Sequence, residues 1–133
     1  MHPSRRLVLS LALGASAGML WGCRRGAPAR KFNAVDLTGA DYAQHLELPD
    51  VDARMRTLAE FAGKVVVVFF GYTQCPDVCP TTLAELAQVR KALGDDGARL
   101  QVVFVTVDPE RDTAPLLKSY VSNFGPGILA LRG

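Results

Sequence analysis

Residues 65–93 read VVVVFFGYTQCPDVCPTTLAELAQVRKAL, and this stretch decides the fold class. Its first part, residues 65–70, is apolar throughout, as expected of a central strand that is buried on both faces. Residues 83–93 then repeat leucine at helical spacing, and Gly94 follows as a helix stop signal. The stretch therefore predicts a buried strand, a connecting loop and a helix.

The same order of elements follows once more along the chain. Residues 100–107 (LQVVFVTV) predict a second strand. Residues 113–124 place their apolar side chains on one helical face, with Asp112 or Thr113 as the N-terminal cap. Residues 128–131 are apolar and would start a third strand. Strands that alternate with helices predict an α/β domain with a parallel sheet and right-handed crossovers.

Length and composition fit a single globular domain with an N-terminal extension. The chain has 133 residues, of which 49% are hydrophobic and 21% charged. We expect a signal peptide or membrane anchor over residues 1–22, a tether over residues 23–47 and the α/β domain over residues 48–133. Because the third predicted strand would leave a bare apolar edge, we expect this domain to be incomplete at its C-terminus.

The N-terminal residues have the layout of a secretory signal. Arg5 and Arg6 precede an uncharged apolar run over residues 7–20. The two arginines also fit a twin-arginine signal. Residues 20–23 (LWGC) resemble the bacterial lipobox, which makes Cys23 the expected site of lipid attachment. A membrane-spanning helix and an unmodified Cys23 are the alternatives, and in each case we expect export.

The charge balance excludes a nucleic-acid partner. The chain carries 15 lysines and arginines against 13 acidic residues, a formal net charge of +2. Removal of Arg5 and Arg6 with the signal leaves the two signs equal in number. No basic stripe follows any predicted helix, so the electrostatic pattern of a nucleic-acid-binding protein is missing.

Cys75 and Cys79 follow the first predicted strand, at the carboxyl end where α/β proteins usually build their sites. In helical geometry, residues four apart lie on one face, so the two sulfurs are within reach of each other or of a shared ligand. Free amide groups at a helix N-terminus stabilise a thiolate. Pro76 and Pro80 each follow a cysteine and restrict the backbone around it. The pair is therefore a candidate Cu(I) site or a redox dithiol.

A structural disulfide and a zinc site are two further interpretations of the cysteine pair. A structural disulfide suits an exported protein, but a bridge across so short a loop removes little freedom from the unfolded chain. A zinc site needs four ligands, and the sequence has neither a second cysteine pair nor a histidine nearby. His45 is interpreted as a solvated residue of the tether. Because two sulfurs leave copper short of ligands, we expect a third ligand from elsewhere in the fold.

Acidic residues accompany the cysteines in the predicted fold. Asp77, between the two cysteines, either tunes their charge or is an ordinary turn residue. Asp108, Glu110 and Asp112 follow the second strand, at the same end of the predicted parallel sheet. We interpret these three as turn and capping residues, with contact to a partner as the alternative.

Two segments resemble the Sco/SenC family of copper-delivery proteins for cytochrome c oxidase: residues 58–86, LAEFAGKVVVVFFGYTQCPDVCPTTLAEL, and residues 104–113, FVTVDPERDT. The resemblance implies a thioredoxin-like fold attached to the bacterial inner membrane, and copper, as Cu(I) or Cu(II), held by two cysteines and a distant histidine. Cys75 and Cys79 match the two sulfur ligands, and Asp77 matches the residue between them. No residue of this chain matches the histidine, which implies truncation at the C-terminus.

These observations support several hypotheses about function. The first is a membrane-tethered periplasmic copper chaperone, whose partner is the copper-bearing subunit of cytochrome c oxidase or another copper chaperone. The second is a thiol-disulfide reductase, hence an enzyme, that acts on the cysteines of a copper-receiving protein. Residues 78–81 (VCPT) also resemble the peroxidatic segment of peroxiredoxins, which makes a peroxidase the third. A scaffold role that does not use the cysteines is the fourth.

Overall fold

The computed structural model describes residues 33–40 and 45–133. Residues 40–133 form a compact unit, and residues 33–39 belong to a separate one. The predictions for the signal or anchor over residues 1–22 and for Cys23 lie outside the described residues. Among the residues that are described, no helix has the length and apolar character needed to cross a bilayer.

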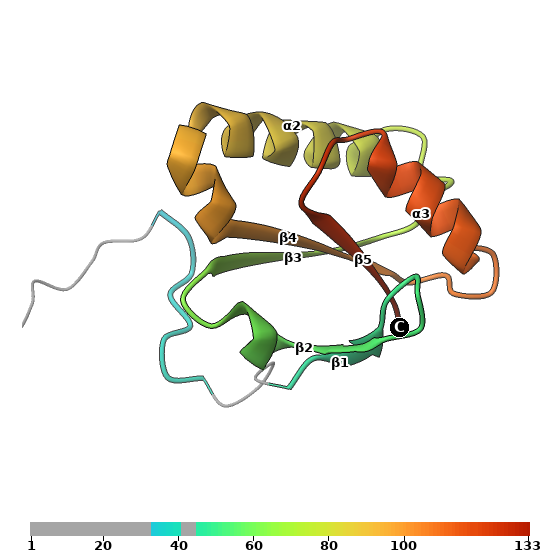
Figure 1. Ribbon diagram of the computed structural model, residues 1–133, viewed down its shortest axis with the longest axis horizontal. Helices are drawn as coiled ribbons and strands as arrows, with labels where there is room; N and C mark the ends of the chain where they lie inside the picture. Colours follow the sequence, from blue (N-terminus) through green and yellow to red (C-terminus); the bar gives the residue numbers. More distant parts are fainter. Residues whose placement is uncertain (1–32, 41–44) are drawn as a thin grey trace, which may run out of the picture. The chain divides into compact units, whose positions relative to one another are not determined.

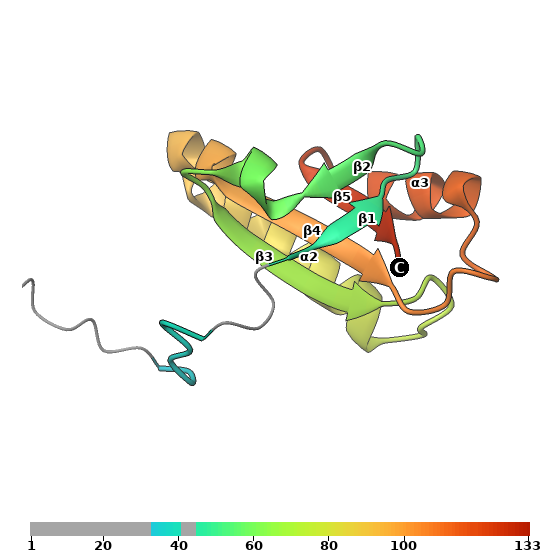
Figure 2. The same cartoon turned by 90° about the horizontal axis from the view of Figure 1, so that it is seen from below.

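The compact unit is built on a three-stranded parallel sheet (Figure 1). The strands lie in the order β3 (Val65–Gly71), β4 (Leu100–Thr106) and β5 (Ile128–Arg132). Two helices, α2 (Val78–Ala92) and α3 (Ala114–Ser122), cover one face of this sheet. The antiparallel hairpin of β1 (Glu47–Pro49) and β2 (Met55–Thr57) lies on the other face (Figure 2). Short 3-10 helices span Leu58–Phe61 and Gly94–Arg99.

Strand β4 is the centre of the core because both of its faces are covered. Val102 and Phe104 pack toward the helices, in a cluster with Leu83 of α2 and Leu117 of α3. The alternate residues of β4, Val103 and Val105, pack toward the hairpin side. This alternation follows from the two-residue period of a strand. Its register pairs residue 71 with residue 106, so β3 and β4 end together at one edge of the sheet.

The predicted alternation of strands and helices is confirmed, but the predicted position of the first strand is wrong. Strand β3 is an edge strand, with Val65 65% exposed and Phe70 61% exposed. On the face that the hairpin covers, Val66 of β3 packs into the core, whereas Val68 and Phe70 are exposed. Strand β5 lies at the other edge of the sheet, as predicted, although Ala130 and Leu131 are buried and Leu131 forms a single bridge with Asp50.

Helix α2 begins at Val78, five residues before the predicted start at residue 83. Pro80 does not prevent this, since amide groups in the first turn of a helix have no carbonyl partner within the helix. Thr113, not Asp112, is the N-cap residue of α3. The side chain of Asp112 is instead buried, with consequences for the cysteine site.

Candidate dithiol site

The two cysteines lie close together at the junction between β3 and α2. Cys79 lies in the first turn of α2 and is only 6% exposed, whereas Cys75 lies in the preceding loop and is partly exposed. Both are free thiols. The backbone N–H of Cys79 donates to the sulfur of Cys75, with an N to Sγ distance of 3.4 Å. The arrangement thus brings together the two residues that the sequence singled out.

The contact between the cysteines does not arise from regular helical spacing as predicted. The residue before the helix, Asp77, has φ −142° and ψ −71°, so the helix does not extend back to Cys75. The loop instead places the Cys75 sulfur near the free N–H groups of the first turn of α2. The sulfur therefore receives the helix N-terminal field from outside the helix.

Hydrogen bonds hold the pKa of Cys75 below the usual range of a cysteine thiol. The backbone N–H of Cys79 makes the largest contribution, followed by the N–H of Asp77 and by the side chain of Cys79. Donors that point at a sulfur stabilise its charged form. Cys75 is therefore the residue of the pair that is suited to act as a thiolate nucleophile or metal ligand.

Burial raises the pKa of the Cys79 thiol above the usual range. The negative charges of Cys75 and Asp112 add to this effect. The two sulfurs thus differ in acidity, because Cys75 loses its proton more readily than Cys79. Such a difference between neighbouring thiols is useful both for disulfide exchange and for binding a soft cation after proton loss.

Gly71, the last residue of β3, provides the space in which Cys79 packs. A Cβ atom at this position would lie 2.9 Å from the Cys79 sulfur and 2.8 Å from the Phe104 ring. Both distances are too short for ordinary van der Waals contact. The absence of a side chain at Gly71 therefore lets the buried thiol lie against the core of the sheet.

A tyrosine of α3 lies within the electric field of the same site. The Tyr120 ring packs against Phe104 at a centroid distance of 5.8 Å. Burial, with added repulsion from Cys79, Cys75 and Asp112, raises the pKa of Tyr120 to about 12. The phenol is therefore a neutral group at physiological pH. The sequence pattern predicts only that Tyr120 lies on the apolar face of its helix.

The acidic residues near the cysteines have different surroundings. The Asp77 side chain is exposed and makes no capping hydrogen bond, and Glu110 is exposed. A hydrogen bond from Arg111 lowers the pKa of Asp108, and the two side chains form an ion pair at the surface. The turn interpretation suits these three residues. It is wrong for Asp112, whose buried carboxylate is bound to Thr73 and Thr106.

The described residues supply two sulfur donors and no complete metal site. No group of three or more His, Cys, Asp or Glu side chains in residues 33–40 and 45–133 is placed to hold a metal ion. His45 is the only histidine in these ranges, and it is exposed ahead of β1. The donor set is soft and suits Cu(I), which accepts few thiolate ligands.

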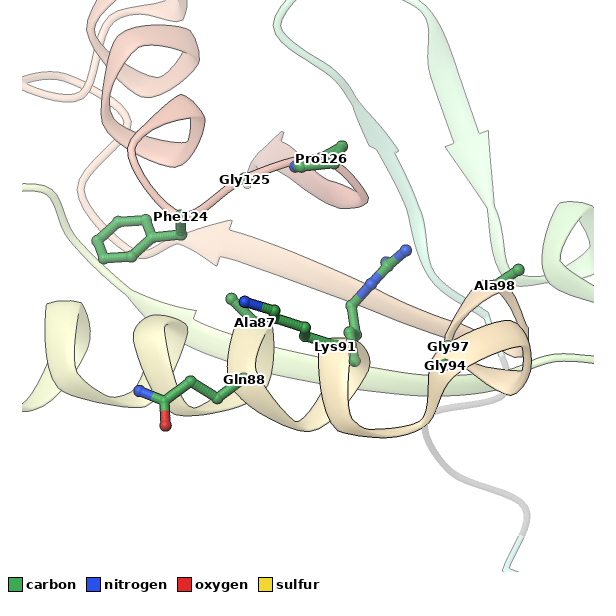
Figure 3. A pocket seen from close by; sticks show the side chains of 10 residues that line it. Ala87, Gln88, Lys91, Gly94, Gly97, Ala98, Phe124, Gly125 and Pro126 are labelled. Atoms are coloured by element: carbon green, nitrogen blue, oxygen red, sulfur yellow. The ribbon is translucent and has the colours of Figure 1, made fainter.

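A pocket of about 550 Å³ lies away from the cysteines (Figure 3). The second half of α2, the following 3-10 helix and the turn before β5 line it. Arg90 crosses beside this pocket and donates to the carbonyl of Gly127 at 2.6 Å. Ala87, on the pocket wall, is eight residues beyond Cys79, or about 12 Å along the helix axis. The pocket and the dithiol are therefore separate features.

Comparison with known proteins supports the resemblance seen in the sequence. The SCO1/SenC family matches residues 35–133. The human protein "SCO2 homolog, mitochondrial" is 37% identical over 96% of this chain and 50% of its own length. A "putative copper-binding protein" of Stutzerimonas stutzeri is 35% identical over all of this chain and 65% of its own length. The chain thus spans about half the length of the mitochondrial relatives that it matches.

Solved structures of Sco proteins have the same mixed α/β fold. Bradyrhizobium japonicum ScoI with copper bound is 43% identical, with a TM-score of 0.62 over 67% of this chain and 57% of that chain. Yeast Sco1 with copper bound is 38% identical, with a TM-score of 0.61 over 67% of this chain and 50% of that chain. Sequence and structure agree, and the chain belongs to the SCO1/SenC family.

Proposed function

We propose that this chain is the copper-binding part of a copper chaperone for cytochrome c oxidase assembly, and that Cys75 and Cys79 bind the ion as Cu(I). The observation that carries the proposal is the contact between a partly exposed sulfur of lowered pKa and a second, buried thiol. Two structures to which the chain is similar contain copper. Copper is here the cargo, which the protein takes up and passes on.

The geometry of the pair suits uptake and release of a soft cation. Cys75 is partly exposed and loses its proton more readily than Cys79, so it is the first ligand to engage. Cys79 follows by losing its proton, since thiolate sulfur is the form that ligates metal. Among the described residues, no His, Cys, Asp or Glu side chain lies close enough to the two sulfurs to complete a metal site. In this proposal the third ligand therefore comes from outside the described residues. An incomplete coordination shell favours transfer of the ion to a partner.

The proposal extends to place and partner. The sequence pattern of residues 1–22, with lipid attachment at Cys23 or a retained N-terminal helix, supports a protein held at the periplasmic face of a bacterial inner membrane. Its partners in this proposal are the copper-bearing subunit of cytochrome c oxidase or another copper chaperone. Labelling of intact cells with a membrane-impermeant thiol reagent tests the orientation, since Cys75 reacts only if it faces the periplasm.

Competition for Cu(I) tests the copper proposal directly. The reduced full chain is titrated against a coloured Cu(I) chelator under anaerobic conditions. Cys75→Ser and Cys79→Ser are each expected to weaken binding by about a hundredfold or more, because each removes one of two soft ligands. Cys23→Ser is the matched control, since this cysteine lies outside the pair, and it should bind as the wild type does. An unchanged Cu(I) affinity in both Cys75→Ser and Cys79→Ser would refute the proposal.

A second candidate function is reduction of a disulfide in a copper-receiving protein, and the unequal pKa values of the pair favour it. The Cys75 thiolate attacks one sulfur of the target disulfide and forms a mixed disulfide, while the other target sulfur leaves as a thiolate. Cys79 then attacks Cys75 and releases the reduced target, so two electrons pass and the Cys75–Cys79 disulfide forms. A single turnover with a disulfide-bonded dithiol peptide tests this. Release of one reduced peptide per chain, abolished in Cys75→Ser, is the expected result.

A further inference from the structure

Asp112 is a buried carboxylate beside the dithiol site. It lies in the loop between β4 and α3, and it is 1% exposed. Aspartate is rarely buried unless its oxygens are satisfied by hydrogen bonds or ion pairs. Among the described residues, no lysine or arginine forms an ion pair with Asp112. The groups that satisfy its carboxylate are therefore neutral.

Three hydrogen bonds satisfy the Asp112 carboxylate. The backbone N–H of Thr73 donates to Oδ2 at 3.0 Å, and the Thr73 hydroxyl donates to Oδ1 at 2.6 Å. The Thr106 hydroxyl donates to Oδ2 at 2.6 Å and itself accepts the backbone N–H of Asp108 at 3.0 Å. One side chain thus joins the loop after β3, the last residue of β4 and the segment that leads into α3.

The loop that Asp112 holds is the loop that carries Cys75. Thr73 lies two residues before Cys75, and both of its bonds to Asp112 span 39 positions of sequence. Cys79 is held differently, because its sulfur packs against the backbone of Gly71 in the core. The position of Cys75 relative to Cys79 therefore depends on the anchoring of this loop.

We propose that Asp112 is the positioning residue of the dithiol: by holding Thr73, its buried carboxylate keeps the sulfur of Cys75 beside the first turn of α2. The negative charge of Asp112 also contributes to the raised pKa of Cys79, which agrees with a place close to the pair. The inference rests on the proposed function only in that both concern the same two sulfurs. Its test measures a disulfide equilibrium and requires no copper.

The expected effect follows from the geometry that a disulfide demands. The two sulfurs must reach a narrow range of separations and angles before they bond. A loop that is already held loses less conformational entropy when the bond forms. Loss of the carboxylate frees the loop that carries Cys75, so the disulfide becomes easier to reduce.

Equilibration with glutathione tests this on the full 133-residue chain. Two glutathione thiols give two electrons and two protons to the Cys75–Cys79 disulfide and become one glutathione disulfide. After alkylation, trypsin cuts at Lys64 and Arg90 and releases a peptide that contains both cysteines and excludes Cys23. The mass of this peptide gives the reduced fraction at each glutathione ratio.

Asp112→Asn is expected to shift the equilibrium toward the reduced dithiol by about tenfold, which corresponds to roughly 30 mV. Thr73→Val removes the hydroxyl bond but keeps the backbone bond to the carboxylate. It is expected to shift the equilibrium in the same direction by about threefold, because fewer of the anchoring bonds are lost. If Asp112→Asn does not fold, Thr73→Val decides the question.

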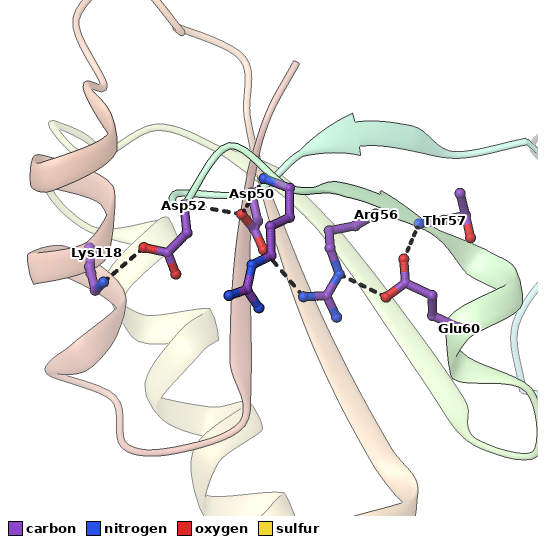
Figure 4. A network of polar contacts seen from close by, with 7 residues as sticks. Asp50, Asp52, Arg56, Thr57, Glu60 and Lys118 are labelled. Atoms are coloured by element: carbon purple, nitrogen blue, oxygen red, sulfur yellow. Dashed lines mark hydrogen bonds and ion pairs between the residues drawn. The ribbon is translucent and has the colours of Figure 1, made fainter.

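Asp50→Asn is the matched control. Asp50 is also a buried aspartate, it also accepts three hydrogen bonds, and it lies in the hairpin segment (Figure 4). We expect this variant to be less stable yet unchanged in its disulfide equilibrium. The proposal is overturned if folded Asp112→Asn, or Thr73→Val in its place, stays within about twofold of the wild type. It is also overturned if Asp50→Asn causes an equal shift. Failure of the wild-type chain to bind Cu(I) would refute the proposed function and leave this result standing.

Discussion

At the scale of single residues, two cysteines of one chemical type differ because of what surrounds them. N–H groups of the first turn of α2 stabilise the Cys75 thiolate, whereas burial disfavours the Cys79 thiolate. Neither effect depends on a bound metal. The difference is therefore a property of the reduced protein alone, and it is accessible to simple thiol chemistry.

We expect iodoacetamide to alkylate Cys75 faster than Cys79. The rate at Cys75 should rise with pH and level off at a midpoint below the usual thiol value of ~8.5, because its folded pKa is lowered. In Cys75→Ser, the remaining Cys79 should react slowly and only at higher pH. Peptide mass mapping separates both sites from Cys23. Equal rates at the two sites, or a Cys75 midpoint above 8.5, would contradict the described electrostatics.

Gly71→Ala is expected to destabilise the fold. The added methyl group would meet the Phe104 ring and the Cys79 sulfur at distances that force one of them to move. Overpacking of this kind costs about 1–3 kcal/mol, measured as the loss in free energy of unfolding in urea. In a Phe104→Leu background the same substitution should cost less, since the smaller side chain leaves room. Equal costs in both backgrounds would show that Phe104 is not the limiting contact.

At the scale of elements, the short hairpin depends on polar contacts. Asp50 accepts the backbone N–H groups of Asp52 and Arg54 at 2.9 and 3.0 Å, and the Arg56 guanidinium donates to it at 3.2 Å (Figure 4). Strands of three residues bury too little apolar surface to be stable alone. The buried carboxylate therefore supplies part of what fixes the hairpin on the sheet.

Asp50→Asn should lower the free energy of unfolding by about 1–3 kcal/mol at pH 7, because it leaves buried donors without a charged partner. Burial alone would raise the pKa of Asp50, but hydrogen bonds from Arg54, Asp52 and Arg56 outweigh it and the pKa is lowered. The contribution is thus present above the unfolded pKa of ~3.9 and is lost as pH falls through the lower folded value.

Urea unfolding at pH 7 and at pH 3 measures this contribution. The difference between wild type and Asp50→Asn should shrink at the lower pH. Asp52→Asn is the control, because the Asp52–Lys118 ion pair is more than half exposed on both sides and should contribute less than about 0.5 kcal/mol. A difference for Asp50→Asn that does not change with pH would refute the assigned role of its charge.

The elements show what local sequence patterns can and cannot predict. Residues 65–70 were identified as a strand because β-branched and aromatic residues suit extended backbone. Their apolar character on both faces suggested a central position, yet β3 lies at the edge. Strand order depends on contacts between distant segments, which a local pattern does not contain. The predicted start of α2 was too late because the first turn of the helix, around Pro80, carries no apolar repeat that would reveal it.

The candidate site, like the fold, was predictable in its local features but not in its contacts between distant segments. Cys75 and Cys79 stood out by type, spacing and place after a strand, and the structure brings them together. Asp112 did not stand out, because an aspartate after a strand is also the pattern of a turn or cap. Its role depends on Thr73, which is 39 positions away in sequence. The one signal in the sequence was the predicted parallel pairing of β3 with β4. This pairing places the loop that carries Thr73 and the loop that carries Asp112 at the same edge of the sheet.

At the scale of the whole molecule, the open edge of β3 is the main feature without a partner among the described residues. Val68 and Phe70 lie on the hairpin side of this strand and are exposed. An unpaired apolar edge strand is a template for pairing with another chain. The same edge ends at the cysteine loop, so self-association there would also restrict access to Cys75.

We therefore expect the 133-residue chain to self-associate with rising concentration, and Phe70→Lys to reduce this, because an edge lysine opposes strand pairing. Sedimentation velocity over a series of concentrations measures the effect. Leu116→Lys is the matched control, since Leu116 is also an exposed apolar residue but lies in helix α3 and not in a strand. Contacts made by the N-terminal residues are common to all three proteins and cancel in the comparison. Equal relief by both substitutions would assign the association to general surface apolarity, whereas relief by Phe70→Lys alone would assign it to the β3 edge.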